Sequence, residues 1–160
     1  MGQGRGKRQP SFAASTSPGA NAAFESATGV PLAPAASVLL TATISKGKKK
    51  KVLAVEAMYT DGNYSPTPPA PRVLNLFVDV NGILMEPTVG PFGALEDCGF
   101  AIPPPVACMI TGSWWLDIDA NPALINAPLT IMLHGGDISS GPLVGVQLMD
   151  VSLSVNMTKK

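Results

Sequence analysis

The sequence has little charge, few aromatic residues and few groups that bind metals or act as acids and bases in catalysis. Only 14% of its 160 residues are charged and 6% are aromatic, and it contains two cysteines and one histidine. Two cysteines and one histidine are too few for a zinc site of the usual ligand spacing. A low density of charge leaves much neutral surface, which a protein tolerates when an assembly covers that surface.

Long hydrophobic runs are also missing. No stretch of 18 apolar residues occurs, so the sequence predicts no membrane-spanning helix and no membrane partner. The basic start, MGQGRGKR, is not followed by an apolar segment, so it does not have the form of a secretory signal. Gly6 stands where a myristoylation signal needs Ser or Thr. We therefore expect a protein that is made in the cytoplasm of its producer.

The charge that is present is sorted by position along the chain. Residues 1–51 contain eight of the eleven Lys and Arg residues and one acidic residue, whereas residues 52–160 contain three basic and ten acidic residues. The first third therefore has a net charge of +7 and the remainder has a net charge of −7. Such a division is typical of a basic binding arm attached to a folded body.

Composition also divides the chain into an arm and a body. Residues 1–35 are basic and glycine-rich at first, then rich in Ala, Ser, Thr and Pro. Taken alone, they bury too little apolar surface to offset the entropy of ordering them. We expect an extended N-terminal arm over residues 1–35 and a single β-sandwich domain over residues 36–160. Sixteen Gly and sixteen Pro residues separate short apolar runs and favour turns between strands.

Two alternating runs flank the main cluster of lysines. Residues 38–44 are apolar at even positions and residues 52–59 at odd positions, which predicts two strands. We expect them to pair as an antiparallel hairpin with the lysines of residues 46–51 at its tip. Those lysines could hold phosphates, steer an acidic partner or simply be solvated. A tip without aromatic residues is a poor platform for single-stranded nucleic acid, so nucleic acid is not expected as a partner.

Further alternating runs complete an all-β pattern. Residues 74–80 lead into Asn81-Gly82, which is the strongest short signal for a hairpin, and residues 108–118 predict another strand. A change of phase from even to odd apolar positions predicts a β-bulge near residues 148–150. About seven or eight strands with Pro-rich connections predict an all-β fold, an antiparallel two-sheet sandwich of the jelly-roll or Greek-key kind.

Three residues at the end of the 108–118 run imitate the start of a calcium-binding loop. Asp117, Asp119 and Asn121 match the Asp-x-Asp-x-Asn pattern. However, Pro122 stands where such a loop needs glycine, and Pro128 where it needs glutamate. We interpret the two aspartates as solvated carboxylates at a strand end, with a weak cation site as the alternative, and expect no metal.

No set of residues predicts catalysis. His134 lies beside Gly135 and Gly136, but the sequence has no Gly-x-Ser-x-Gly elbow and no activated nucleophile to accompany it. The glycine-rich start also lacks the Lys-Ser/Thr ending of a phosphate-binding loop. We therefore expect a protein that is not an enzyme, with no catalytic residue and no cofactor, in which His134 is hydrogen-bonded at a turn.

Adjacent residues of a strand point to opposite faces, so the side chains of Trp114 and Trp115 should lie on opposite faces of the sheet. The phase of the strand places Trp114 in the core and Trp115 on a mixed face, where it could contact a partner subunit, stack on a sugar or be covered by the protein's own loops.

Cys98 and Cys108 would close a short loop if bridged by a disulfide, which contributes roughly 2–3 kcal/mol of stability. Two buried thiols are the alternative.

The chain resembles small phage virion proteins in three features. These are an arm rich in Ala, Ser and Pro, a β-body of this size, and strand runs such as residues 38–44 and 51–60. The resemblance is to capsid decoration (cement) proteins and head-fibre bases, which are β-sandwiches or barrels and are often trimeric. It implies a non-enzymatic structural protein located in the virion. Such a protein would dock on a capsid or shell protein through its arm and form a homo-oligomer, with a trimer favoured, through its body.

The residues expected to contact a partner are basic or aromatic and lie in the arm, at the lysine-rich tip or on the mixed face. They are Arg5, Lys7, Arg8, Phe12, Phe24, Lys48, Lys49, Lys50 and Trp115. Two other functions stay open on the sequence alone. One is a carbohydrate-binding β-sandwich module that uses Trp115, and the other is a small-virus coat protein whose basic arm lies inside the particle.

Overall fold

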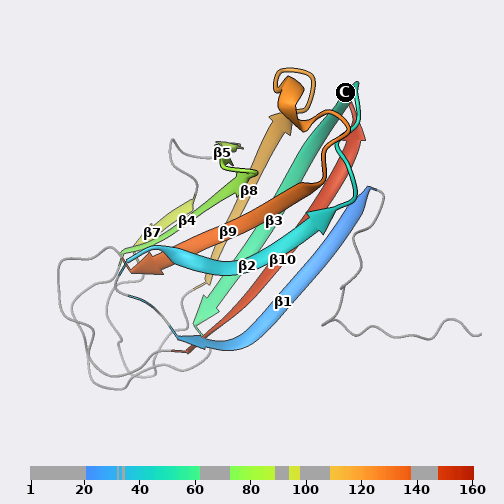
Figure 1. Cartoon of the computed structure of the whole chain (residues 1–160). Coiled ribbons are helices and arrows are strands. Elements are labelled where there is room, and N and C mark those ends of the chain that lie inside the picture. The colour runs from blue at the N-terminus through green and yellow to red at the C-terminus, as the bar shows by residue number, and fades with distance from the viewer. Residues whose placement is uncertain are drawn as a thin grey trace, which may run out of the picture.

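The protein is an all-β chain, as the sequence predicts (Figure 1). The computed structural model describes residues 21–31, 33, 35–61, 73–88, 94–97, 109–137 and 148–160. Within these ranges the secondary structure is strands and one short 3₁₀ turn, with no α-helix. No helix in this part of the chain is long and apolar enough to cross a membrane.

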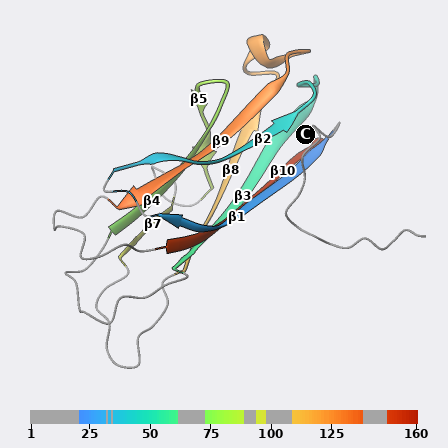
Figure 2. The same ribbon diagram turned by 60° about the horizontal axis from the view of Figure 1, so that its bottom comes forward.

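The strands form two antiparallel sheets that pack face to face (Figures 1 and 2). Sheet I has the strand order β1-β10-β3-β8-β6, and sheet II has the order β2-β9-β4-β5, with β7 also beside β4. The elements are β1 (Ala22–Pro31), β2 (Ser37–Ile44), β3 (Lys51–Asp61), β4 (Val73–Val80), β5 (Ile83–Leu84), β6 (Glu86–Pro87), β7 (Ala94–Asp97), β8 (Met109–Asp117), the 3₁₀ turn η3 (Pro122–Leu124), β9 (Leu129–Asp137) and β10 (Leu148–Lys159).

The strand pairs show how the chain is wound. β1 pairs with β10, β2 with β9, β3 with β8 and β4 with β7, and every pair is antiparallel. Successive pairs alternate between sheet I and sheet II. The chain is therefore one long hairpin rolled around a core, which is the jelly-roll form of the sandwich.

The predicted hairpin between residues 38–44 and 52–59 is wrong. β2 pairs with β9 in sheet II, whereas β3 pairs with β10 and β8 in sheet I. The lysine-rich turn between β2 and β3 therefore crosses from one sheet to the other, and their apolar faces meet across the core. Alternation specifies which face of a strand is buried, but it does not specify the partner strand.

The core lies between the sheets and follows the predicted alternation along β3, β4 and β8. Trp114 is 1% exposed and Trp115 is 44% exposed, so the predicted separation of the two tryptophans is confirmed. Gly112 makes room for Trp114, because a Cβ atom at position 112 would lie 2.4 Å from the indole ring. The other large and fully buried side chains are Tyr59, Ile44, Leu53, Leu76, Met85, Ile118, Leu124, Leu129, Ile131, Leu133 and Met149.

The strand irregularity predicted near residues 148–150 lies on a neighbouring strand. β10 pairs with β3 in unbroken register from Met149 to Lys159. The extra residue is in β1, between Ala27 and Val30, where Gly29 has a φ of 66° and donates its N–H to the Asp150 carboxylate at 3.3 Å. Val144 and Val146, whose even positions suggested the change of phase, lie outside the described residues.

A second irregularity lies in β2. The register against β9 shifts between Val38 and Leu40, and the Val38 side chain is 50% exposed. Alternation alone predicts Val38 on the same buried face as Ala42 and Ile44, both of which are buried as expected. The extra residue in the ladder reverses the direction of the side chains that precede it.

Asn81-Gly82 forms the predicted hairpin turn between β4 and β5. Both residues have positive φ angles, 50° and 85°, as a two-residue turn of type I′ requires. The Asn81 side chain also binds the start of β9, since its Nδ2 donates to the Pro128 carbonyl at 3.0 Å and its Oδ1 accepts the Thr130 N–H at 2.8 Å. The turn therefore anchors two neighbouring strands of sheet II.

Residues 22–31, which composition placed in the extended arm, form β1 at the edge of sheet I. The strand pairs with β10 over its length, and the side chain of Ala23 in this strand is buried. The low apolar content of this segment is offset by backbone hydrogen bonds to a strand that lies far away in the sequence, which composition does not reveal. Residues 1–20 lie outside the described part of the chain.

Candidate functional site

All the basic side chains in the described ranges lie at one end of the sandwich. Four come from the turn between β2 and β3, and a fifth, Lys51, begins β3. Two more lie at and just after the end of β10, where Lys159 pairs with Lys51 in the β3–β10 ladder. The Lys160 N–H also donates to the Lys50 carbonyl, at 3.4 Å. We call this group the lysine end; it consists of Lys46, Lys48, Lys49, Lys50, Lys51, Lys159 and Lys160.

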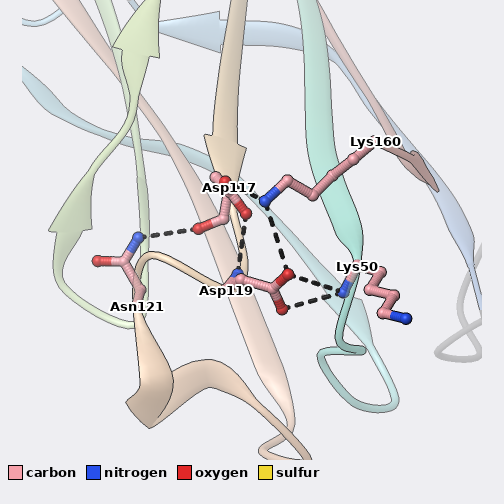
Figure 3. Close-up of polar contacts among 5 residues, drawn as sticks. All are labelled: Lys50, Asp117, Asp119, Asn121 and Lys160. Carbon is pink, nitrogen blue, oxygen red and sulfur yellow. Dashed lines mark hydrogen bonds and ion pairs between the residues drawn. The ribbon is translucent and has the colours of Figure 1, made fainter.

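Two carboxylates lie inside the lysine end (Figure 3). The Lys160 Nζ is 2.7 Å from the Asp117 Oδ2 and 3.6 Å from the Asp119 Oδ2. Both carboxylate oxygens of Asp119 accept the Lys50 N–H, at 2.9 and 3.1 Å. The Asp117 Oδ1 accepts the Asp119 N–H at 2.9 Å, and Asn121 Nδ2 donates to the Asp117 carbonyl at 3.1 Å.

The contact between Asp117 and Lys160 favours the charged form of both groups. The hydrogen bond from Lys160 lowers the pKa of Asp117 below its ordinary value of 3.8, and the same bond raises the pKa of Lys160 above 10.5. The two side chains are 25% and 43% exposed, so water and salt screen the pair. At neutral pH the pair joins the end of β10 to the end of β8.

The three residues that imitate a calcium loop direct their polar atoms at the protein itself. Asp117 binds the ammonium group of Lys160, and Asp119 binds the main chain of Lys50. The aspartates are therefore ion-paired carboxylates rather than simply solvated ones. Within the described ranges, no group of three or more His, Cys, Asp or Glu side chains could hold a metal ion.

The turn that carries most of these lysines is held in a fixed shape. Gly47 donates its N–H to the Ala127 carbonyl at 2.8 Å and accepts the Asn126 N–H at 2.9 Å. A Cβ atom at Gly47 would lie 2.1 Å from the Leu124 carbonyl oxygen, so only glycine fits. Lys50 has a φ of 58°, in the left-handed region, and its side chain points away from the two carboxylates (Figure 3).

The base of the predicted arm is attached at the same end. The Lys48 Nζ donates to the Asn21 Oδ1 at 3.1 Å, and the Asn21 carbonyl accepts the Met157 N–H at 2.7 Å. Residue 20 is covalently joined to Asn21, so the segment that contains Arg5, Lys7, Arg8 and Phe12 starts from the lysine end. Those four predicted contact residues themselves lie outside the described residues.

The outer face of sheet I is a second candidate surface. It carries three of the five large apolar side chains that are exposed in the described ranges, namely Phe24, Met58 and Trp115. Trp115 lies opposite Ala54 on β3 and opposite Glu86 on β6. The structure therefore places the predicted contact residues Phe24 and Trp115 on one face, and Lys48, Lys49 and Lys50 at the end of the sandwich.

His134 lies on the outer face of sheet II, in β9 rather than at the predicted turn. Its Nε2 contacts the Asp79 Oδ2 at 2.5 Å, and its ring stacks on Phe77 with the centroids 4.6 Å apart. The predicted hydrogen-bonded state is therefore confirmed. The predicted disulfide between Cys98 and Cys108 falls outside the described residues.

The contribution of β10 to the lysine end is the feature that the sequence prediction missed. Lys159 and Lys160 are more than 100 residues away from Lys50 in the sequence, and only the pairing of β3 with β10 brings them together. The odd-position alternation of residues 149–157 predicts a strand that ends near these lysines, but it does not name the partner. No protein-family model and no curated protein matches the chain.

Proposed function

We propose that the protein is a non-enzymatic structural protein of a virus or phage particle, of the capsid decoration or capsid-associated kind. In this role it docks on a capsid or shell protein through its N-terminal arm and forms a homo-oligomer, with a trimer favoured, through its body. Jelly rolls serve in viral capsids, but also in lectins and cupins, so the fold alone does not select this role. The support comes from the surface that this jelly roll presents.

The main supporting observation is the outer face of sheet I. Phe24, Met58 and Trp115 are all more than one third exposed there, and all the lysines of the described ranges lie elsewhere, at the end of the sandwich. The strand registers place Glu56 and several serines between these three side chains. Large apolar side chains exposed within a polar surface are typical of the anchor residues of a protein interface. Tryptophan is among the residues that contribute most to binding at such interfaces.

The attachment of the arm is also consistent with docking on a neighbour. Its base lies at an end of the sandwich, away from the middle of the outer face of sheet I, so body and arm can make separate contacts. Residues 1–20 span up to about 70 Å when extended, which is enough to reach across an adjacent subunit. Their positive charge favours an acidic partner surface.

Sedimentation of the purified chain tests the oligomer. We expect an oligomer that Trp115→Glu dissociates, because a buried, unpaired charge would replace an apolar anchor. Val38→Glu is the matched control, since Val38 is exposed to a similar degree, 50%, but lies on sheet II. A monomeric wild-type chain, or equal loss in both variants, would refute oligomerisation through this face.

Incorporation into particles tests the arm. A chain that lacks residues 1–20 retains all of β1, so we expect it to keep the circular dichroism spectrum of the full chain. We expect it to be lost from purified particles after density-gradient centrifugation, while the full chain stays with them. If the shortened chain is incorporated as well as the full chain, the arm is not the docking element.

A carbohydrate-binding module is the second candidate, because Trp115 is accessible beside a carboxylate and hydroxyl groups. Glu86 pairs with Trp115 across β6 and β8, and the hydroxyls of Thr88 and Ser113 contact each other nearby. An aromatic ring among such groups can stack on a sugar. A glycan array would test this function. We expect binding that persists in Trp115→Phe, which keeps an aromatic ring, and disappears in Trp115→Ala, which removes it.

A further inference from the structure

The lysine end has a large excess of positive charge. Seven lysines face two aspartates, which leaves five positive charges in excess. The aspartates also do not neutralise the group evenly. Within the described ranges, the ion pairs at this end involve Lys160 alone. The Asp119 carboxylate accepts its shorter contacts from the Lys50 main-chain N–H.

The remaining lysines extend from a turn whose backbone is already fixed. The main chain of Gly47 is hydrogen-bonded to the main chain of residues 126 and 127. The Asp119 carboxylate accepts the N–H of Lys50 and so holds Lys50 in its left-handed conformation. The Lys50 side chain points outward from this support (Figure 3). A partner that binds several of these amines together would have to order side chains but not the backbone, which lowers the entropic cost of binding.

The basic residues of the arm are joined to the same end through Asn21. Asn21 is bonded to Lys48 and to Met157, so Arg5, Lys7 and Arg8 are tethered to the lysine end by fewer than 20 residues.

The lysine side chains themselves suit the charged backbone of a polyanion better than the edges of bases. Residues 44–51, 117–128 and 157–160 contain no Trp, Tyr or Phe, and the exposed Trp115 lies on the outer face of sheet I, two residues before Asp117. Lysine binds phosphate as a point charge, without the fixed fork that arginine uses on base edges and carboxylates. Contacts would therefore go to the backbone of the polymer.

We propose that the lysine end binds the phosphate backbone of nucleic acid without sequence preference. The inference goes beyond the proposed structural role and does not depend on it. The sequence argues against nucleic acid because the tip has no aromatic residues for single-stranded bases to stack on. Contacts to phosphates do not need such residues, and the fold adds Lys159 and Lys160 to the tip.

Fluorescence anisotropy on the full-length chain tests the proposal. A labelled mixed-sequence DNA duplex and a labelled RNA single strand are titrated at several salt concentrations between about 50 and 200 mM. If five phosphates are neutralised on the duplex, the logarithm of the affinity should fall against the logarithm of salt with a slope of about −4.5. Duplexes of different sequence should bind equally.

Substitutions locate the binding surface. Lys48→Gln combined with Lys49→Gln should reduce the steepness of the salt slope by about 2, whereas the corresponding pair of arginine substitutions should leave the slope unchanged. Glu56→Gln, in the middle of the outer face of sheet I, is the control and should not change the slope. A set of Arg5, Lys7 and Arg8 to Gln substitutions should weaken binding but leave a salt-dependent remainder.

Four results would overturn the proposal. The first is that neither nucleic acid binds at about 50 mM salt, and the second is that the Lys48 and Lys49 glutamine pair does not change binding. The third is that the arm substitutions alone abolish binding, and the fourth is a strong preference for one sequence. Tighter binding of polyglutamate than of the duplex at equal ionic strength would assign the lysine end to an acidic protein partner instead.

Discussion

At the scale of single residues, the parity of a position in its strand was the most informative part of the sequence. It placed Trp114 inside and Trp115 outside, and it identified the buried side of β3 and β4. The positive φ angles of Asn81 and Gly82 were predicted for the same kind of reason, since local sterics alone decide them. The positive φ of Lys50 was not predictable, because it depends on Asp119, which is distant in the sequence.

The backbone of Lys50 provides a test at this scale. A residue with a Cβ atom in the left-handed region is disfavoured by roughly 1–2 kcal/mol, which exceeds the entropic cost of glycine of about 0.5–1 kcal/mol. We therefore expect Lys50→Gly to raise the free energy of unfolding by about 0.5–1 kcal/mol in chemical denaturation. Lys49→Gly, at a position without positive φ, should lower it. Equal changes in both variants would contradict this explanation.

The pKa of Asp117 provides a second test. Because Lys160 lowers this pKa below 3.8, the contribution of Asp117 to stability is present above that value and is lost as pH falls through the lowered pKa. The raised pKa of Lys160 gives the opposite limit: its contribution is present below 10.5 and is lost as pH rises through the raised pKa.

Carboxyl NMR titration would measure the first of these shifts directly. We expect Lys160→Met to return the pKa of Asp117 towards 3.8, and Lys159→Met, which removes a neighbouring charge without this hydrogen bond, to change it less. An Asp117 pKa that does not move in Lys160→Met would show that the contact is not formed in solution.

At the scale of elements, the existence of strands was predictable but their partners were not. The runs that became β2 and β3 are adjacent in the sequence and similar in pattern, yet each belongs to a different sheet. The bulge illustrates the same limit, since the change of phase pointed to β10 while the extra residue lies in β1. Pairing between distant segments is set by packing over the whole core, and no short window of sequence contains it.

The turn between β4 and β5 can be tested at this scale, because Asn81 connects it to β9. Asn81→Ala removes two hydrogen bonds and places a Cβ residue of lower left-handed preference at a φ of 50°, so we expect a loss of about 1–3 kcal/mol in the free energy of unfolding. Asn81→Gly keeps the turn conformation and should lose less. Urea denaturation of the two variants separates turn geometry from the link to β9.

At the scale of the whole molecule, the sequence predicted the sandwich and its class, and it located most of the positive charge. It could not show that this charge is gathered at one end, because that depends on β10 running back beside β3. It also assigned residues 22–31 to an arm, although β10 provides a strand partner for them. Both differences follow from contacts between the two ends of the chain.

The two candidate surfaces predict different responses to salt. Contacts made by the basic arm or the lysine end should weaken at about 1 M salt, where the screening length is about 3 Å, whereas an apolar contact through the outer face of sheet I should persist. Sedimentation of the oligomer and gradient analysis of particle-bound protein would measure the two separately. Particle association that is unchanged at this salt concentration would contradict an electrostatic arm contact.

The pairing of β1 with β10 also has a consequence for how the protein is made. The first strand of sheet I cannot pair with its neighbour until residues 148–159 have been synthesised, so the sheet cannot close before then. Folds dominated by such distant pairings form slowly, in milliseconds to seconds. The core can therefore form only after residues 148–159 are available, and until then the strands of the body lack part of their partners.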